Sequence, residues 1–280
     1  MSLIDLSGKI DSYNIGIYES IVSAANSLGI EFLVVGATAR DLMLEWVYNI
    51  PPYRRTKDID LGVRVKDWNQ FEELKAALVK SGKFNLTTLS QRIEYGGVHP
   101  IDIVPFGEIS SQDEIIEWPP DNDVHLNVEG FREAYENRLV LRLRDQPRLE
   151  ISVASLPSQV VLKFLAWNDR KFVDNKDAID IAIILTNYGD INEDRLFGEE
   201  SSVMEEEEFD IVYAGAKLLG LDIKRISSSG IIKKITVILD EQIDKEQSNF
   251  KLAEDMNGFI SAEFERSLNL LTKVKEGILR

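Results

Sequence analysis

Apolar residues in the first half of the chain follow two different spacings. Ile17, Ile21 and Leu28 recur at the spacing of a helix, and Gly29 follows as a stop signal. Residues 31–35 are instead a short apolar, partly β-branched run, which is typical of a buried strand. Repeated along this half, the alternation predicts an α+β domain with a small mixed sheet. Its predicted helices cover residues 14–28, 37–47, 69–81 and 131–137, and its predicted strands cover residues 31–35, 58–65, 84–89, 92–95, 100–104, 139–143 and 149–153.

Helical spacing dominates the second half, from Pro157 onward. We predict helices over residues 157–170, 174–188, 205–219, 231–242 and 262–278. The change of pattern predicts a boundary near Ser155, with a first domain of residues 1–155 and a helical second domain of residues 156–280. The acidic run from Glu205 to Glu208 is predicted to be a solvated first helical turn, because acidic side chains favour that position.

The composition limits the classes of protein. The 280 residues include no cysteine and only two histidines, which excludes disulfides and thiolate metal sites. With 32 basic and 48 acidic residues the formal charge is -16, so broad binding to nucleic acid is not expected. No apolar run approaches the roughly 20 residues of a membrane helix, and no charged-then-apolar leader is present. We therefore predict a soluble, cytoplasmic protein with no membrane partner.

Two carboxylates in the predicted strand 58–65 are the first candidate site residues. Alternate side chains of a strand share a face, so Asp58 and Asp60 project together while Ile59 and Leu61 face the core. Adjacent carboxylates repel each other, and a divalent cation beside them is the simplest explanation of their coexistence. Hard oxygen ligands at a site that handles phosphate favour magnesium.

A glycine turn upstream of these carboxylates is the second candidate. Gly36 follows a predicted strand and opens a predicted helix, whose free N–H groups and positive dipole end can hold phosphate oxygens. Gly36 permits a close approach, Ala37 offers its backbone N–H, and Thr38 can add a hydroxyl contact. Taken alone, the same residues would also suit an ordinary tight turn.

Asp102 is the third candidate, alone among apolar residues in a predicted strand. Such a position is costly for a carboxylate unless a partner is present. A metal shared with Asp58 and Asp60 would supply that partner, and Asp102 would then be near enough to accept a proton from an attacking hydroxyl. The alternative is that Asp102 caps a loop before Pro105.

The order of these motifs resembles that of a known group. The first 105 residues are similar to the DNA polymerase β-type nucleotidyltransferase superfamily, and most similar to its AbiEii-type members, which include toxins of abortive-infection and toxin–antitoxin systems. The resemblance is carried by Gly36-Ala37-Thr38-Ala39, by the strand Asp58 to Leu61, by Lys163 in a later helix, and by the pair Lys176-Asp177. Ala37 departs from the glycine or serine usual at its position, and residues 45–55, with Tyr53, Arg54 and Arg55, are extra chain near the site.

The resemblance implies an enzyme that moves a nucleoside monophosphate from a nucleoside triphosphate to a hydroxyl-bearing acceptor and releases pyrophosphate. It implies two magnesium ions on Asp58 and Asp60, with Asp102 sharing one and activating the acceptor. Lys163 and Asp177 would help to hold the nucleotide, and Arg40 would offset triphosphate charge. The helical domain would complete the cleft for nucleotide and acceptor. Lys163, Trp167 and Arg170 share a helix face, so Trp167 would either meet the nucleotide or belong to the core.

Several alternatives stay open at this point. Gly36 to Leu44 is also similar to the head of tRNA CCA-adding enzymes and poly(A) polymerases, although their arginine-rich strand motif is missing. A catalytically idle fold acting as an antitoxin or protein-binding module is a third reading. The acceptor can be a tRNA, a protein or a small molecule, and a cognate antitoxin is a possible partner. Five arginines form the densest basic stretch, as an RNA contact or a solvated face: Arg132, Arg138, Arg142, Arg144 and Arg148.

Overall fold

The computed structural model describes residues 3–53, 55–112, 114–120, 123–244, 249–256 and 264–280. The chain separates into two compact units, residues 1–155 and 156–280. No helix among the described residues is long and apolar enough to cross a membrane.

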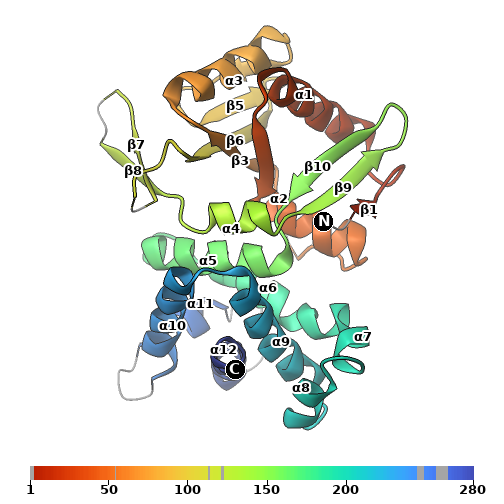
Figure 1. Ribbon diagram of the computed structural model, residues 1–280, viewed down its shortest axis with the longest axis vertical. Helices are drawn as coiled ribbons and strands as arrows, with labels where there is room; N and C mark the ends of the chain where they lie inside the picture. The colour runs from red at the N-terminus through yellow and green to blue at the C-terminus, as the bar shows by residue number, and fades with distance from the viewer. Residues whose placement is uncertain (1–2, 54, 113, 121–122, 245–248, 257–263) are drawn as a thin grey trace. The chain divides into compact units, whose positions relative to one another are not determined.

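The first unit is built on an eight-stranded mixed sheet in the order β1-β9-β10-β2-β3-β6-β5-β4 (Figure 1). Its strands are β1 (Leu3–Asp5), β2 (Glu31–Val35), β3 (Ile59–Val65), β4 (Phe84–Leu86), β5 (Arg92–Tyr95), β6 (His99–Gly107), β9 (Leu139–Arg144) and β10 (Leu149–Val153). A separate hairpin is formed by β7 (Ile115–Trp118) and β8 (Val124–Asn127). Its helices are α1 (Ser12–Leu28), α2 (Gly36–Asp41), α3 (Trp68–Lys80) and α4 (Phe131–Glu136).

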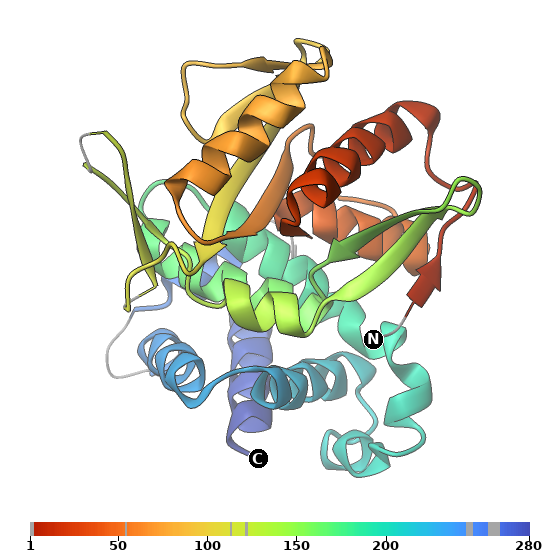
Figure 2. The ribbon, with the colours of Figure 1, turned by 45° about the horizontal axis from the view of Figure 1, so that its top comes forward.

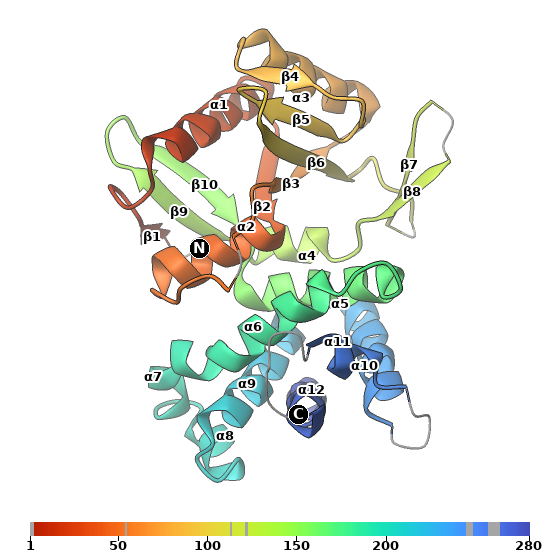
Figure 3. The same ribbon diagram turned by 180° about the vertical axis from the view of Figure 1, so that it is seen from behind.

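Local sequence signals explain where the helices of this unit begin. Asp11 caps α1 by accepting the N–H groups of Tyr13 and Asn14, and Gly29 ends it in a left-handed conformation. Asp67 caps α3 in the same way through the N–H of Gln70. The two helices lie side by side against one face of the sheet, and α2 lies at the ends of β2 and β3 (Figures 2 and 3).

The centre of the sheet is where β3 lies between β2 and β6. β3 pairs antiparallel with β2 and parallel with β6. Ile59, Leu61 and Val63 of β3 are buried, as the alternation of the sequence predicts. These pairings place the predicted carboxylates in the middle of the sheet instead of at an edge.

The second unit is helical (Figure 1). Its helices are α5 (Leu156–Arg170), α6 (Lys176–Ile191), α7 (Glu193–Leu196), α8 (Ser201–Glu206), α9 (Ile211–Ile226), α10 (Ser229–Ile243), α11 (Lys251–Met256) and α12 (Phe264–Leu279). α9 packs against α12 with the backbones in close contact, because a Cβ on Gly220 would lie 2.1 Å from the carbonyl oxygen of Val274. A mixed sheet followed by a helical region confirms the predicted α+β fold class.

The predicted helix over 205–219 is wrong, and so is the solvated acidic turn. α8 ends at Glu206, Glu208 and Phe209 have positive φ, and Asp210 caps α9 through the N–H groups of Val212 and Tyr213. Glu207 is only 7% exposed and accepts from Lys217 at 2.7 Å. The capping signal of Asp210 outweighs the helical spacing, and a lysine ten residues later buries the acidic run.

Other boundaries differ in smaller ways. The predicted helix 37–47 starts at Gly36 and changes after Asp41 into a π-helical turn, Leu42–Val47. The predicted strand 84–89 stops at Leu86, and α6 starts and ends later than predicted. β1, β7 and β8 were not predicted. The first residues of the predicted helix 262–278 lie outside the described residues.

Candidate active site

The three predicted carboxylates belong to two neighbouring strands of the first unit. Asp58 immediately precedes β3, and Asp60 is its second residue. Asp60 and Asp102 are direct partners in the parallel pairing of β3 with β6. The apolar neighbours Ile59 and Ile101 are buried, so both aspartates project from the opposite face of the sheet. Strand alternation and register therefore bring Asp60 and Asp102 together.

Gly36 lies against one of these carboxylates. Its neighbour Val35 is the cross-strand partner of Asp60. Gly36 has φ +67°, and a Cβ on it would lie 2.1 Å from Oδ2 of Asp60. Glycine is needed here both for the left-handed backbone and for the space that the Asp60 carboxylate occupies.

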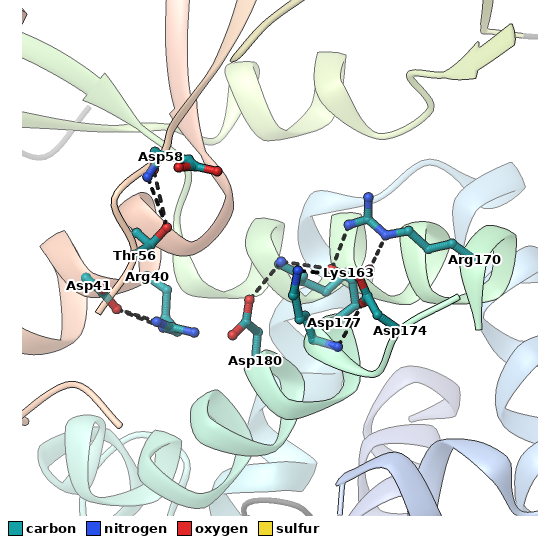
Figure 4. Close-up of polar contacts among 10 residues, drawn as sticks. Arg40, Asp41, Thr56, Asp58, Lys163, Arg170, Asp174, Asp177 and Asp180 are labelled. Carbon is teal, nitrogen blue, oxygen red and sulfur yellow. Dashed lines mark hydrogen bonds and ion pairs between the residues drawn. The ribbon is translucent and has the colours of Figure 1, made fainter. Parts of the chain in front are cut away.

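Thr38 fixes the segment that leads into β3. Its Oγ1 donates to the carbonyl oxygen of Asp58 at 2.6 Å, and the N–H of Asp58 donates to Oγ1 of Thr56 at 3.3 Å (Figure 4). Thr38 thus positions Asp58 through its backbone. Ala37 lies next to it in the first turn of α2 and is partly exposed.

Arg40 turns to its own neighbour. Its Nε and Nη2 donate to Oδ1 of Asp41 at 2.9 and 2.6 Å, and its side chain is 2% exposed (Figure 4). Within the extra chain, Arg55 pairs with Glu45 at 2.9 Å and Tyr53 is exposed, whereas Arg54 lies outside the described residues.

Arg92, which the sequence analysis did not single out, joins the carboxylates. It lies directly opposite Asp102 in the antiparallel pairing of β5 with β6. Its Nε and Nη2 donate to Oδ1 and Oδ2 of Asp102, each at 2.7 Å, and Nη2 is 3.6 Å from Oδ2 of Asp58. The hydrogen bond with Asp102 raises the pKa of Arg92 further above its ordinary value. The signal was available: counting outward from the Gly96-Gly97 turn places residue 92 opposite residue 102.

Two of the three carboxylates suit a divalent cation. Among the described residues, no group of three or more histidine or acidic side chains is arranged to hold a metal ion. Asp58 and Asp60 offer hard oxygen donors two residues apart, the side chain of Asp58 is 45% exposed, and glycine at position 36 leaves room at Asp60. Both oxygens of Asp102, by contrast, accept from Arg92.

A cavity of about 150 Å³ lies beside the segment that precedes Asp58. Thr38, Thr56, Lys57 and His99 are among its lining residues. Burial lowers the pKa of His99, against the opposing effect of Asp58, and the buried Nε2 of His99 has no hydrogen-bond partner among the described residues. The cavity thus combines hydroxyl, ammonium and imidazole groups next to the carboxylates.

Lys163 and Asp177 meet in the second unit. Lys163 on α5 lies 2.9 Å from Asp177 and 2.8 Å from Asp180, both on α6, and Arg170 makes a 2.6 Å ion pair with Asp177 (Figure 4). Burial lowers the pKa of Lys163, but Asp180 and Asp177 outweigh it and the net shift is upward. Burial raises the pKa of Asp177, but Arg170 and Lys163 outweigh it and the net shift is downward. All these groups stay charged at neutral pH.

Trp167 belongs to the core and not to a nucleotide site. Its side chain is fully buried, and its indole N–H donates to Asp255 of α11 at 3.0 Å. The basic stretch between residues 132 and 148 is also taken up within the first unit. Arg142 and Arg148 pair with Glu150, Arg144 pairs with Glu19, and Arg132 pairs with Glu114.

Comparison with known proteins identifies the class. The family described as "Nucleotidyl transferase AbiEii toxin, Type IV TA system" matches residues 21–264. The chain belongs to this AbiEii family and is a nucleotidyltransferase. Comparison with curated proteins gave no match.

Solved structures with a similar fold are nucleotidyltransferases too. ANT(2″)-Ia in complex with adenylyl-2″-tobramycin is 16% identical, with a TM-score of 0.36 over 58% of this chain and 81% of that one. An antigenic nucleotidyltransferase-like protein from Paracoccidioides brasiliensis is 20% identical, with a TM-score of 0.41 over 61% and 74%. The Thermotoga maritima CCA-adding enzyme complexed with tRNA is 13% identical, with a TM-score of 0.28 over 98% and 82%.

Proposed function

We propose that this nucleotidyltransferase moves a nucleoside monophosphate from a nucleoside triphosphate to a hydroxyl-bearing acceptor, with magnesium bound at Asp58 and Asp60. The observation that carries the proposal is the contact of the Gly36 turn with the Asp60 carboxylate, beside the Asp102 strand. This contact joins the two parts that the reaction needs, a phosphate-binding turn and a cation-binding carboxylate pair.

The residues of the first unit have separate tasks in this proposal. Asp58 and Asp60 hold the cation, which when bound offsets the charge of the phosphates. The Gly36 turn and the Ala37 N–H receive phosphate oxygens at the start of α2. Thr38 keeps Asp58 in place through the 2.6 Å bond to its carbonyl oxygen. Positioning and charge neutralisation account for most of the catalysis in transfers of this type.

Lys163 and Asp177 form the second part of the nucleotide site. Asp177 and Asp180 keep Lys163 charged and orient its ammonium group, which is 14% exposed. A lysine held in this way provides a point charge for a phosphate. Arg40 is engaged by Asp41, so we assign it to supporting α2 and not to direct contact with the triphosphate.

A role as the toxin of a toxin–antitoxin pair follows from the family description. The acceptor would then be a cellular component whose modification stops growth, and a tRNA, a protein and a small metabolite all fit the chemistry. A cytoplasmic location belongs to the same proposal. Expression of the chain in a bacterial host, with and without Asp60→Asn, tests toxicity directly. Growth arrest that disappears in the variant supports the toxin role, and equal growth of both contradicts it.

Transfer itself is tested with labelled substrate. The purified chain is incubated with each of the four α-³²P-labelled ribonucleoside triphosphates, magnesium and, in parallel, total tRNA, cytosolic proteins or small-molecule extract. We expect label on one acceptor class, and none with Asp60→Asn. Glu117→Gln removes a charge from an exposed position of the hairpin β7–β8 and serves as the matched control. Equal labelling by the wild type and Asp60→Asn would overturn the proposal.

A further inference from the structure

A positively charged side chain already occupies the space between the candidate metal ligands. Arg92 meets Asp102 with two parallel hydrogen bonds of 2.7 Å, the fork geometry in which a guanidinium binds a carboxylate most firmly. Both oxygens of Asp102 are therefore engaged. An ion that used Asp102 as a ligand would have to displace this contact.

The same guanidinium extends toward the other carboxylates. Nη2 of Arg92 lies 3.6 Å from Oδ2 of Asp58, and both Asp58 and Asp60 stabilise its charged form. An arginine does not lose its proton in a protein, so this charge is permanent. The three carboxylates thus share one fixed positive charge.

The sheet holds Arg92 in this position. Arg92 and Asp102 are direct partners between β5 and β6, and the next strand position is closed by the N–H of Ile103, which donates to the carbonyl of Gln91 at 2.8 Å. On the other side, Ile93 and Ile101 are partners and both are fully buried. The contact is therefore built into the ladder and does not depend on a mobile loop.

We propose that Arg92 is a built-in cation of this active site, so that the enzyme binds one divalent ion, on Asp58 and Asp60, instead of two. Asp102 is then a positioning residue that holds Arg92, and it is not a metal ligand. The inference rests on the proposed function. Its physical basis is that a second divalent ion near Asp102 would meet both the repulsion of the guanidinium and the loss of its two hydrogen bonds.

The ratio of bound ions to bound nucleotide tests the proposal. The full chain is equilibrated by dialysis with Mn²⁺ and an α,β-nonhydrolysable nucleoside triphosphate analogue, and bound manganese and bound nucleotide are measured. We expect a ratio of one for the wild type. We expect a ratio of two for Arg92→Gln, which frees Asp102, and a ratio that stays at one for Arg92→Lys, which keeps the charge. A ratio of two in the wild type overturns the proposal.

Controls separate this proposal from a purely structural role of the pair. Arg64→Gln removes an exposed guanidinium that pairs with Glu31 on the same sheet, and it should leave the ratio at one. If Arg92→Gln does not fold, Asp102→Asn decides: an unchanged ratio of one supports the proposal, and a loss of ion binding contradicts it. Nucleotide binding that is indifferent to Mn²⁺ and to Asp60→Asn would instead refute the proposed function.

Discussion

The chain holds two clusters of charged residues that differ in their balance. In the first unit, three carboxylates, Asp58, Asp60 and Asp102, share the single guanidinium of Arg92. In the second unit, Asp177 and Asp180 face two cations, Lys163 and Arg170. The first cluster keeps an excess of negative charge and calls for an external cation, whereas the second neutralises itself. The comparison teaches that equally acidic motifs can serve metal binding in one unit and the orientation of a lysine in the other.

The largest effect is expected when the carboxylate pair of the first cluster is broken. Asp60→Asn should lower nucleotidyl transfer by about a thousandfold or more, because the divalent cation loses a ligand where phosphate charge is neutralised. The fold should persist, since removing a charge from a cluster with excess negative charge relieves repulsion. Initial rates of label transfer and the thermal midpoint, compared with Glu117→Gln, check both halves of the expectation. A variant with full activity would remove the contrast between the clusters.

The second cluster should respond in stability. Lys163→Met leaves the carboxylates of Asp177 and Asp180, whose side chains are 2% and 1% exposed, without their shared ammonium partner. Breaking a buried ion pair in this way costs about 3–5 kcal/mol in the free energy of unfolding. Lys233→Met on α10 changes an exposed lysine of the same unit and should cost little. Urea denaturation measures both, and equal midpoints would show that Lys163 is not needed to balance the cluster.

Two glycines in the first unit allow a matched test of the Gly36 contact. Gly36→Ala and Gly29→Ala both place a side chain at a positive φ, but only the former puts a Cβ against Asp60, since nothing lies within 4 Å of a Cβ at Gly29. Both should lose about 1 kcal/mol of stability. Only Gly36→Ala should also lower transfer, by about a hundredfold, because it displaces a cation ligand. Similar activity losses in the two variants would show that backbone strain alone is responsible.

The acid limb of stability should sharpen the description of the second cluster. The pKa of Asp177 is lowered in the folded chain from its ordinary value of 3.8. Its stabilisation is therefore complete above that value and is lost as the pH falls through the lower folded pKa. Thermal midpoints between pH 6 and pH 2 should fall less steeply for Asp177→Asn than for the wild type. Asp190→Asn, at an exposed position of α6, should follow the wild type.

The smallest effect is expected at the support of Asp58. Thr38→Val removes the hydroxyl that donates to the Asp58 carbonyl, at a cost of about 1 kcal/mol, and should slow transfer several-fold without abolishing it. Thr272→Val on α12 removes a comparable bond of 2.9 Å to the carbonyl of Leu268, away from the first cluster. It should change stability but not the transfer rate. An unaltered rate in Thr38→Val would mean that Asp58 needs no such support.

The two clusters were not equally open to prediction from sequence. Strand alternation predicts that Asp58 and Asp60 share a face, and the glycine at position 36 marks a turn that precedes a helix. The pairing of Lys163 with Asp177 came only from the family resemblance, because their contact joins two helices whose packing no local pattern records. Asp180 completes that cluster and carried no sequence signal of its own.

The parts that were missed have physical causes. Arg92 was overlooked because single-strand alternation says nothing about cross-strand neighbours until the register is fixed. β1 has only three residues and lies at an edge of the sheet, so its apolar signal is short. The acidic run ending at Glu208 was misread because Lys217 and Lys273, which bury Glu207, follow far along the chain.

The most direct test of the central claim is calorimetric titration of the full chain with each of the four ribonucleoside triphosphates, with and without magnesium. The same titration of the double variant Asp58→Asn/Asp60→Asn completes it. We predict that one nucleotide binds the wild type only when magnesium is present, and that the double variant loses this binding while remaining folded. Magnesium-independent binding, or binding that survives in the double variant, would contradict the assignment of the first cluster as the nucleotidyltransferase centre.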